Sequence, residues 1–321
     1  VVPDLGAFEI VRPMGVQQSN SSLVYDERVV LKLLRQITDP SRDLEMTKAL
    51  WSAGFRQVAE PIGVWARQGR DLAMAQRYLG GGVEAWALAR TSLRDLFGSG
   101  NEPEIAGGDF AGDCRRIGET TAQMHRVLAQ AFGSEPAEPR SWVDLMNSSL
   151  ERVSDPRLDV DAARGLFDSL ADLADAGSSM RIHGDYHLGQ LVETDDGWFV
   201  LDFEGEPARP AAERRAPSSP LRDVAGMLRS LDYAARVVEA EHENPHGSQA
   251  ESWIQRNREA FLDGYTQAVG GLDLLPSDDT SFKMILRAFE LDKAIYEVGY
   301  ERAHRPDWVE IPLRAVESML A

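Results

Sequence analysis

Three consecutive glycines, Gly80 to Gly82 in "LGGGVEAW", divide the chain into two parts with different residue patterns. Glycine restricts its backbone least, so this run predicts a flexible joint. Before the joint, β-rich runs predict strands at 8–13, 21–26, 28–35, 61–67 and 71–79, with one helix near 40–54. Beyond it, apolar residues repeat mostly at helical spacing. The order predicts a small β-rich lobe, residues 1–79, and a larger helical lobe, residues 80–321, with any cleft at the joint.

The helical lobe has one expected β interruption, "RIHGDYHLGQLVETDDGWFVLDFEGEP", residues 181–207. Within it, "LVETDDGWFVL" alternates apolar and polar residues around "DDG", which is typical of a tight hairpin turn. Helical spacing is expected over 84–97, 107–133, 141–153, 158–175, 219–241, 251–269 and 279–303.

Charge and composition exclude several classes of protein. The formal net charge of −18 argues against nucleic acid and anionic membranes as partners. No run approaches the ~20 apolar residues of a membrane span, and no signal peptide is evident. The single cysteine, Cys114, excludes an internal disulfide and fits a cytoplasmic location.

The hairpin brings candidate ligands for a hard cation together. Gln190 lies six residues before Asp196, and Asp202 lies six residues after it, so a turn centred there would place Gln190 opposite Asp202. Their side-chain oxygens suit Mg²⁺. Asp185, just ahead of the hairpin, could accept a proton from an attacking hydroxyl.

Three interpretations of "HGDYHLGQ" compete. The spacing of His183, Asp185 and His187 would suit a zinc hydrolase, but the other histidines show no pairing with it. The histidines could instead be structural. Phosphoryl transfer is favoured, because it also accounts for Lys32, one of only four lysines, in the strand "VVLKLLR". Its expected ion-pair partner is Glu45 in the following helix, the alternative being a solvated strand lysine.

The small lobe also contains "QQSNSSL", between two expected strands. Small polar residues in a turn can present amides and hydroxyls to phosphate oxygens, although a plain hairpin turn has the same composition.

Together, the strand lysine, helix glutamate, glycine joint, "HGDYHLGQ" and "LDFEGEP" resemble the protein-kinase-like small-molecule kinases, the aminoglycoside phosphotransferase and choline kinase group. Longer blocks, including "LDFEGEPARPAAERRAPSSPLRDVAGMLRSLDYAAR" and "LDKAIYEVGYERAHRPDWVEIPLRAV", resemble the actinobacterial maltokinases. Gln190 stands where most relatives of the wider group have Asn. The N-terminal cap of the maltokinases is expected to be largely absent from residues 1–79.

The resemblance implies an α+β, bilobal protein-kinase-like fold and a maltokinase activity, which converts maltose and ATP to maltose 1-phosphate on the trehalose-to-α-glucan route. It implies ATP and Mg²⁺ as cofactors and trehalose synthase as a possible partner. The alternatives are a related sugar kinase, such as a glucosamine kinase, or a non-catalytic kinase-like scaffold.

The resemblance also assigns roles to residues. Asp185 would be the catalytic base, and Gln190 and Asp202 would hold the metal. The residues assigned to ATP are Ser19, Asn20, Ser21, Ser22, Lys32, Glu45, Gln76 and Tyr78.

The sugar pocket is assigned to His187, Asp223, Lys293, Tyr296 and Tyr300. Tyr296 and Tyr300 are four residues apart and share a helix face, so packing against the core is the alternative for them. Asp223 could instead favour the dipole at the start of its helix.

Overall fold

The structure is a computed structural model. It describes residues 6–14, 20–35, 37, 40–105, 108–153, 155–241, 247–270 and 273–321.

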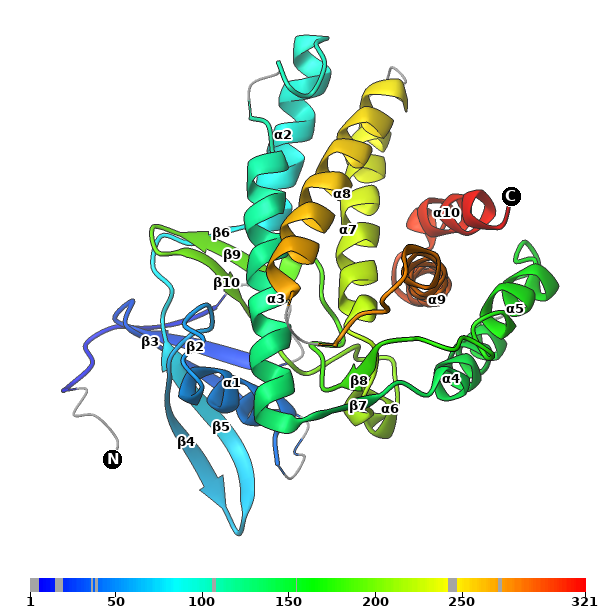
Figure 1. Ribbon diagram of the computed structural model, residues 1–321. Coiled ribbons are helices and arrows are strands. Elements are labelled where there is room, and N and C mark those ends of the chain that lie inside the picture. Colours follow the sequence, from blue (N-terminus) through cyan, green and yellow to red (C-terminus); the bar gives the residue numbers. More distant parts are fainter. Residues whose placement is uncertain are drawn as a thin grey trace.

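The N-terminal region is an antiparallel five-stranded sheet in the order β1-β2-β3-β5-β4 (Figure 1). Its strands are β1 (Val11–Pro13), β2 (Ser21–Tyr25), β3 (Val29–Leu33), β4 (Pro61–Arg67) and β5 (Arg70–Arg77). The helix α1 (Arg42–Ser52) lies between β3 and β4 in the chain. The expected strands and helix of this region are confirmed.

Lys32 points to a buried face of the sheet. It lies opposite Ser22 on one side and Met74 on the other, and Val24, two residues from Ser22 and so on the same face, is buried as well. Only 8% of Lys32 is exposed, so the predicted alternative of a solvated strand lysine is wrong.

The rest of the chain is mainly helical (Figure 1). Its helices are α2 (Ala85–Ser99), α3 (Ala111–Phe132), α4 (Pro139–Arg152), α5 (Val160–Asp168), α6 (Ala211–Arg215), α7 (Leu221–Ala240), α8 (Gly247–Val269), α9 (Asp279–His304) and α10 (Glu310–Leu320), with short 3₁₀ turns η1 (Leu188–Gln190) and η2 (Pro306–Trp308). Within the described residues, none of the helices combines the length and the apolar character needed to cross a bilayer. The α+β prediction is confirmed.

Helices α3 and α8 are in close backbone contact. A Cβ atom added to Gly118 of α3 would lie 2.2 Å from the carbonyl oxygen of Phe261, and one added to Gly264 of α8 would lie 2.2 Å from the carbonyl oxygen of Arg115. Such a distance is a clash, so only glycine permits this helix crossing.

The hairpin of β9 (Leu191–Thr194) and β10 (Gly197–Val200) lies between the sheet and the helices (Figure 1). β6 (Val83–Glu84), directly after the glycine joint, pairs with β9. The amide of Val200 donates to the carbonyl of Gln57 at 2.8 Å, which links the hairpin to the N-terminal region. The boundary between residues 79 and 80 stays a prediction, although β6 shows that the chain has joined the second sheet by Val83.

Several elements differ from the prediction. The residues 181–207 are not the one β interruption, because β7 (Ser134–Pro136) pairs with β8 (Ser178–Met180) in a separate two-stranded sheet. α5 ends at Asp168, before the predicted residue 175. α10 follows Pro306, where the helical pattern was expected to end.

Candidate active site

Three carboxylates surround Lys32. Its Nζ lies 2.7 Å from Asp43 Oδ2, 2.9 Å from Asp202 Oδ1 and 3.1 Å from Glu204 Oε1. We call these four residues the nucleotide-side cluster. Their elements are β3, the first turn of α1 and the loop after β10, so the cluster joins the two parts of the chain.

Burial and mutual repulsion shift the titration of these groups. Burial, reinforced by Asp43 and Glu204 and opposed by Lys32, raises the pKa of Asp202 to about 6. Burial alone would raise the pKa of Asp43 too, but Lys32 holds it below its usual value. Burial disfavours the charged form of Lys32, yet the three carboxylates raise its pKa. The lysine therefore stays protonated.

The predicted Lys32–Glu45 ion pair is wrong, because Asp43 takes that place. Residues two positions apart on a helix do not face the same way, so Glu45 points away from the sheet when Asp43 points toward it. Glu45 instead pairs with Arg181 at 2.6 Å and Arg215 at 3.6 Å.

The hairpin register differs by one residue from the prediction. Thr194 pairs with Gly197, so the turn consists of Asp195 and Asp196. The Leu201 amide donates to the Gln190 carbonyl at 2.9 Å, which places Leu201, and not Asp202, opposite Gln190. A one-residue shift moves each side chain to the other face of the hairpin. The prediction that the hairpin register places Gln190 opposite Asp202 is therefore wrong.

Asp202 reaches the cluster through its backbone conformation. Its φ of 58° is in the left-handed region, which is uncommon for a residue other than glycine. This kink ends the strand and directs the carboxylate to Lys32. The Gln190 side chain instead lies 3.5 Å from His187 Nε2. Its role as a metal ligand stays a prediction.

The nucleotide-side cluster offers the donor set that a divalent cation needs. Carboxylate oxygens of Asp43, Asp202 and Glu204 all lie within 4.8 Å of one another. Hard oxygen ligands suit Mg²⁺. Both oxygens of Asp43 already accept hydrogen bonds, from Lys32 and from the Phe203 amide. Asp202 and Glu204 are therefore the residues that would hold the ion.

The other predicted ATP residues lie near this cluster or along the sheet. The Asn20 side chain donates to Glu204 and accepts from the Arg35 amide at 3.1 Å. Ser21 and Ser22 lie in β2, within the strand expected over 21–26. Ser19 lies outside the described residues.

Gln76 and Tyr78 lie at the end of β5. Gln76 pairs with Val30, and the Tyr78 amide donates to the Arg28 carbonyl at 2.9 Å. Since that amide is already used within the sheet, adenine would have to contact other atoms here. The ATP roles of Ser21, Ser22, Gln76 and Tyr78 stay predictions.

Asp223 positions the loop that carries Asp185. Its Oδ2 accepts the His183 amide at 2.7 Å and lies 3.1 Å from His125 Nε2, while its Oδ1 accepts the Gly184 amide at 2.8 Å. Only 1% of Asp223 is exposed. Asp223 therefore holds this loop in the structure, and its predicted contact with a sugar stays a prediction.

His183 is structural, as one of the sequence interpretations expected. It is fully buried, and its Nε2 lies 2.8 Å from the Leu201 carbonyl oxygen, to which a protonated ring nitrogen donates. Its Nδ1 accepts the Asp185 amide at 3.3 Å. Neither nitrogen is open to a zinc ion, which removes the basis for the hydrolase interpretation.

A second charged cluster supports Asp185. Lys293 Nζ lies 3.1 Å from Asp185 Oδ1 and 2.7 Å from Glu206 Oε1. Glu206 also pairs with Arg209 and with Arg222, the latter at 3.1 Å. Arg209 in turn lies 2.7 Å from Asp292. The acceptor-side cluster is defined as these six residues: Asp185, Lys293, Glu206, Arg209, Arg222 and Asp292.

A cavity of about 360 Å³ opens beside Asp185. Four of the predicted sugar residues line this cavity together with Asp185. They are His187, Lys293, Tyr296 and Tyr300. The rings of Tyr296 and Tyr300 are stacked, with centroids 6.3 Å apart. Burial lowers the pKa of His187, so its ring is neutral at neutral pH. Contact of these residues with a sugar stays a prediction.

Sequence reasoning missed Asp43, Glu204 and Glu206 as site residues. Glu204 carried a local signal, since it follows Asp202 by two residues in "DFE". Asp43 carried none that distinguishes it from Glu45, because the choice depends on how α1 is rotated against the sheet. Glu206 is placed by its contact with Lys293, a residue 87 positions away.

Comparison with known proteins finds phosphotransferases. Residues 111–268 match the phosphotransferase enzyme family (APH). A glucosamine kinase from Streptacidiphilus jiangxiensis is 29% identical over 98% of this chain and 75% of its own length. A glucosamine kinase from Mycolicibacterium smegmatis is 26% identical over 96% of this chain and 79% of its own length. The solved structure of a glucosamine kinase in complex with glucosamine, ADP and inorganic phosphate superposes with a TM-score of 0.80, at 26% identity, over 97% of this chain and 76% of that one.

The family match covers slightly less than half of this chain, so these findings show a similarity to phosphotransferases, and they confirm the predicted fold class. The similar proteins are glucosamine kinases, which supports a sugar-kinase activity in the broad sense. They do not support the finer prediction of a maltokinase with a role in glycogen or trehalose metabolism.

Proposed function

We propose that this protein is an ATP-dependent sugar kinase whose acceptor is an amino sugar of the glucosamine type. The similarity to glucosamine kinases supports the reaction class. The charge of the cavity beside Asp185 is the observation that favours an amino sugar over maltose.

The cavity walls carry more acidic than basic side chains. Glu84, Glu297 and Glu301 join Asp185 there, against Lys293 and Arg305 as cations, and His187 is neutral. These wall groups alone carry an excess of two negative charges, part of which is offset by Arg229, which is buried outside the wall and lies 2.8 Å from Glu297. A protonated amino sugar brings a compensating ammonium group, which maltose and glucose lack.

Aromatic residues supply the apolar part of the cavity. Trp86, Tyr233, Tyr296 and Tyr300 all line it. Rings of this kind stack on the apolar faces of a sugar, while their hydroxyl groups bond to sugar hydroxyls. The combination of rings and carboxylates suits a small cationic carbohydrate.

The proposed reaction is an in-line transfer of the γ-phosphoryl group of ATP. Asp185 accepts the proton of the acceptor hydroxyl as its oxygen forms a bond to the γ-phosphorus, and the bond from that phosphorus to the β–γ bridging oxygen breaks to release ADP. Lys293 holds Asp185 in place. Lys32 neutralises phosphate charge, and Mg²⁺ held by Asp202 and Glu204 would supply further charge stabilisation. Most of the rate enhancement then comes from positioning and charge.

The direct test measures ADP formation with Mg²⁺ and ATP on glucosamine, glucose, maltose and trehalose. Glucose is the matched probe, because it replaces the amine by a hydroxyl of similar size. A charge-assisted hydrogen bond contributes about 1.5–3 kcal/mol, so kcat/KM should favour glucosamine over glucose by roughly 10- to 100-fold.

An Asp185→Asn variant should lower kcat by on the order of 10²–10⁴ if Asp185 is the base. Asp172→Asn is the control, since Asp172 is exposed and pairs only with Arg140 among the contacts described. Turnover of maltose alone would restore the maltokinase interpretation. If none of the sugars raises ADP formation above background, the non-catalytic scaffold would be favoured.

A further inference from the structure

Arg42, the first residue of α1, connects the N-terminal region to both loops of the reaction centre. Its guanidinium donates to the carbonyl of Ile182 at 2.6 Å, to the carbonyl of His183 at 2.9 Å and to the carbonyl of Phe203. Ile182 and His183 lead into Asp185, and Phe203 follows Asp202. One side chain therefore holds the two loops that carry the proposed base and metal ligand.

Asp43 completes the contact from the same turn of α1. Its Oδ1 accepts the Phe203 amide at 3.0 Å, and its Oδ2 accepts from Lys32 at 2.7 Å. Both polar main-chain groups of Phe203 are thus bound by α1. Asp202, directly before Phe203, has the strained φ of 58°, and such a conformation persists only where its surroundings fix it.

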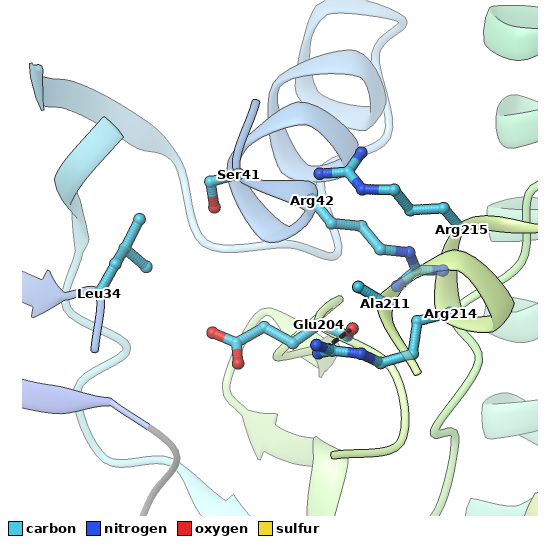
Figure 2. Close-up of a pocket in the computed structure, with 7 residues that line it drawn as sticks. All are labelled: Leu34, Ser41, Arg42, Glu204, Ala211, Arg214 and Arg215. Carbon is cyan, nitrogen blue, oxygen red and sulfur yellow. Dashed lines mark hydrogen bonds between the residues drawn. The ribbon is translucent and has the colours of Figure 1, made fainter. Parts of the chain in front are cut away.

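Two arginines of α6, Arg214 and Arg215, bind main-chain carbonyls in the loop of Glu204 and just before α1. Figure 2 shows Arg215 extending from α6 toward the start of α1, where it donates to the Pro40 carbonyl. Arg214, also on α6, donates to the carbonyl oxygen of Glu204 at 3.3 Å. Figure 2 also shows the Arg42 side chain running from α1 toward the loop of Glu204. The start of α1 is thereby fixed to the catalytic loops from both directions.

The chemistry of arginine suits this task. A guanidinium presents five N–H groups in one rigid plane, whereas a lysine ammonium is a compact point charge that cannot bind three separated carbonyls in a fixed geometry. Burial of Arg42 lowers its pKa to about 10, which shows that the charge is held in an unfavourable environment. An apolar side chain at this position would leave the three carbonyl oxygens without this donor, which is destabilising for buried acceptors.

We propose that Arg42 is a positioning residue of the reaction centre, which sets the separation between Asp185 and Asp202 by holding the loops on which they lie. The proposal rests on the proposed kinase function. Arg42 contacts neither substrate in this account, so its loss removes alignment and leaves the binding groups in place. Misalignment lowers kcat much more than it raises KM.

The first experiment compares Arg42→Lys and Arg42→Ala with the wild type. Arg42→Lys should lower kcat by roughly 100-fold, while KM for ATP and for the sugar stays within about threefold. Added guanidinium should restore part of the kcat of Arg42→Ala, and methylammonium should not. Arg258→Ala is the matched control, since Arg258 joins α8 to α9 by its pair with Glu290 at 2.7 Å. It should lower thermal stability and leave kcat unchanged.

A second measurement does not depend on the acceptor. The Phe203 amide, held by Asp43, should exchange with deuterium faster in Arg42→Lys than in the wild type, and Arg258→Ala should leave it protected. This readout decides the proposal even if the wild type phosphorylates none of the sugars, which would overturn only the proposed function.

A folded Arg42→Lys protein with the kcat of Arg258→Ala would overturn the proposal, as would a loss confined to KM. Unchanged protection of Phe203 in Arg42→Lys would do the same. If Arg42→Ala does not fold, Arg42→Lys and the exchange measurement carry the test.

Discussion

The two charged clusters of the site have opposite electrostatic designs. The nucleotide-side cluster places one lysine among three carboxylates, so it has an excess of negative charge. The acceptor-side cluster contains three cations, Lys293, Arg209 and Arg222, and three carboxylates. The nucleotide-side cluster would need a further cation to balance its carboxylates, whereas the acceptor-side cluster has equal numbers of cations and carboxylates.

Titration follows the same division. Burial and neighbouring carboxylates raise the pKa of Asp202 to about 6, so this group holds its proton more tightly than an ordinary aspartate does. Burial would also raise the pKa of Glu206, but Lys293, Arg209 and Arg222 lower it well below its usual value. The first cluster is suited to receive ligands, and the second is suited to fix Asp185.

Removal of Asp202 should have the largest effect. Asp202→Asn removes a proposed cation ligand, and charge stabilisation worth several kcal/mol goes with it, so activity should fall to background. Without nucleotide, the variant should be at least as stable as the wild type, because it removes repulsion among carboxylates. Coupled ADP assays and urea unfolding measure the two effects.

Asp196→Asn, in the exposed turn of the same hairpin, is the control for this variant. Substantial remaining activity in Asp202→Asn would show that the negative cluster does not bind the cation.

Lys293→Met tests the balanced cluster. It leaves the part-buried carboxylate of Asp185 and the buried carboxylate of Glu206 without their shared cation. Breaking a buried ion pair from one side reduces the free energy of unfolding by about 3–5 kcal/mol. Glu206 keeps two arginines, so the lower end of this range is expected. Urea unfolding provides the measurement.

Adding Glu206→Gln to Lys293→Met should recover part of this loss. A Lys293→Met protein as stable as the wild type would show that the acceptor-side charges are not coupled.

The smallest predicted effect is the pH dependence of stability. Because the pKa of Asp202 is raised from 3.8 to about 6, its contribution to stability is fully present below the lower value and is lost as pH rises through the higher one. The wild type should therefore lose unfolding free energy relative to Asp202→Asn between these pH values, by at most about 1.4 kcal/mol per pH unit.

Urea unfolding of both proteins across this range gives the difference directly. A wild type that gains unfolding free energy relative to Asp202→Asn as pH rises would contradict this prediction. Mg²⁺ competes with the proton for Asp202, so stabilisation by Mg²⁺ and ADP should be larger at pH 7 than at pH 5.

Local sequence patterns predicted most of the fold. Period-two and helical spacing placed the five N-terminal strands, α1 and the long helices of the second lobe within a few residues. The pairing of β7 with β8 was missed, because each strand has only three residues and their partners lie far apart in the chain. α10 lies beyond residue 303, the end of the last expected helical range, because the chain starts a further helix at Glu310, four residues after Pro306.

The chemical types at the site were also predictable, but their partners were not. Lys32, Asp185 and Asp202 stand out by residue type and position. The preference of Lys32 for Asp43 depends on the rotation of α1, and the position of Gln190 depends on one residue of hairpin register. Arg42 gave no signal, because its contacts are with main-chain carbonyls about 140 and 160 positions away.

The glycine crossing of α3 and α8 has a consequence at the other end of a chain of contacts. Tyr265, next to Gly264, has its hydroxyl 2.9 Å from His125 Nδ1 on α3, and His125 contacts Asp223, which binds the amides ahead of Asp185. The distance between the two helix backbones therefore affects the position of Asp185. A methyl group added at either glycine would displace the carboxylate of Asp185, although neither glycine lines the cavity.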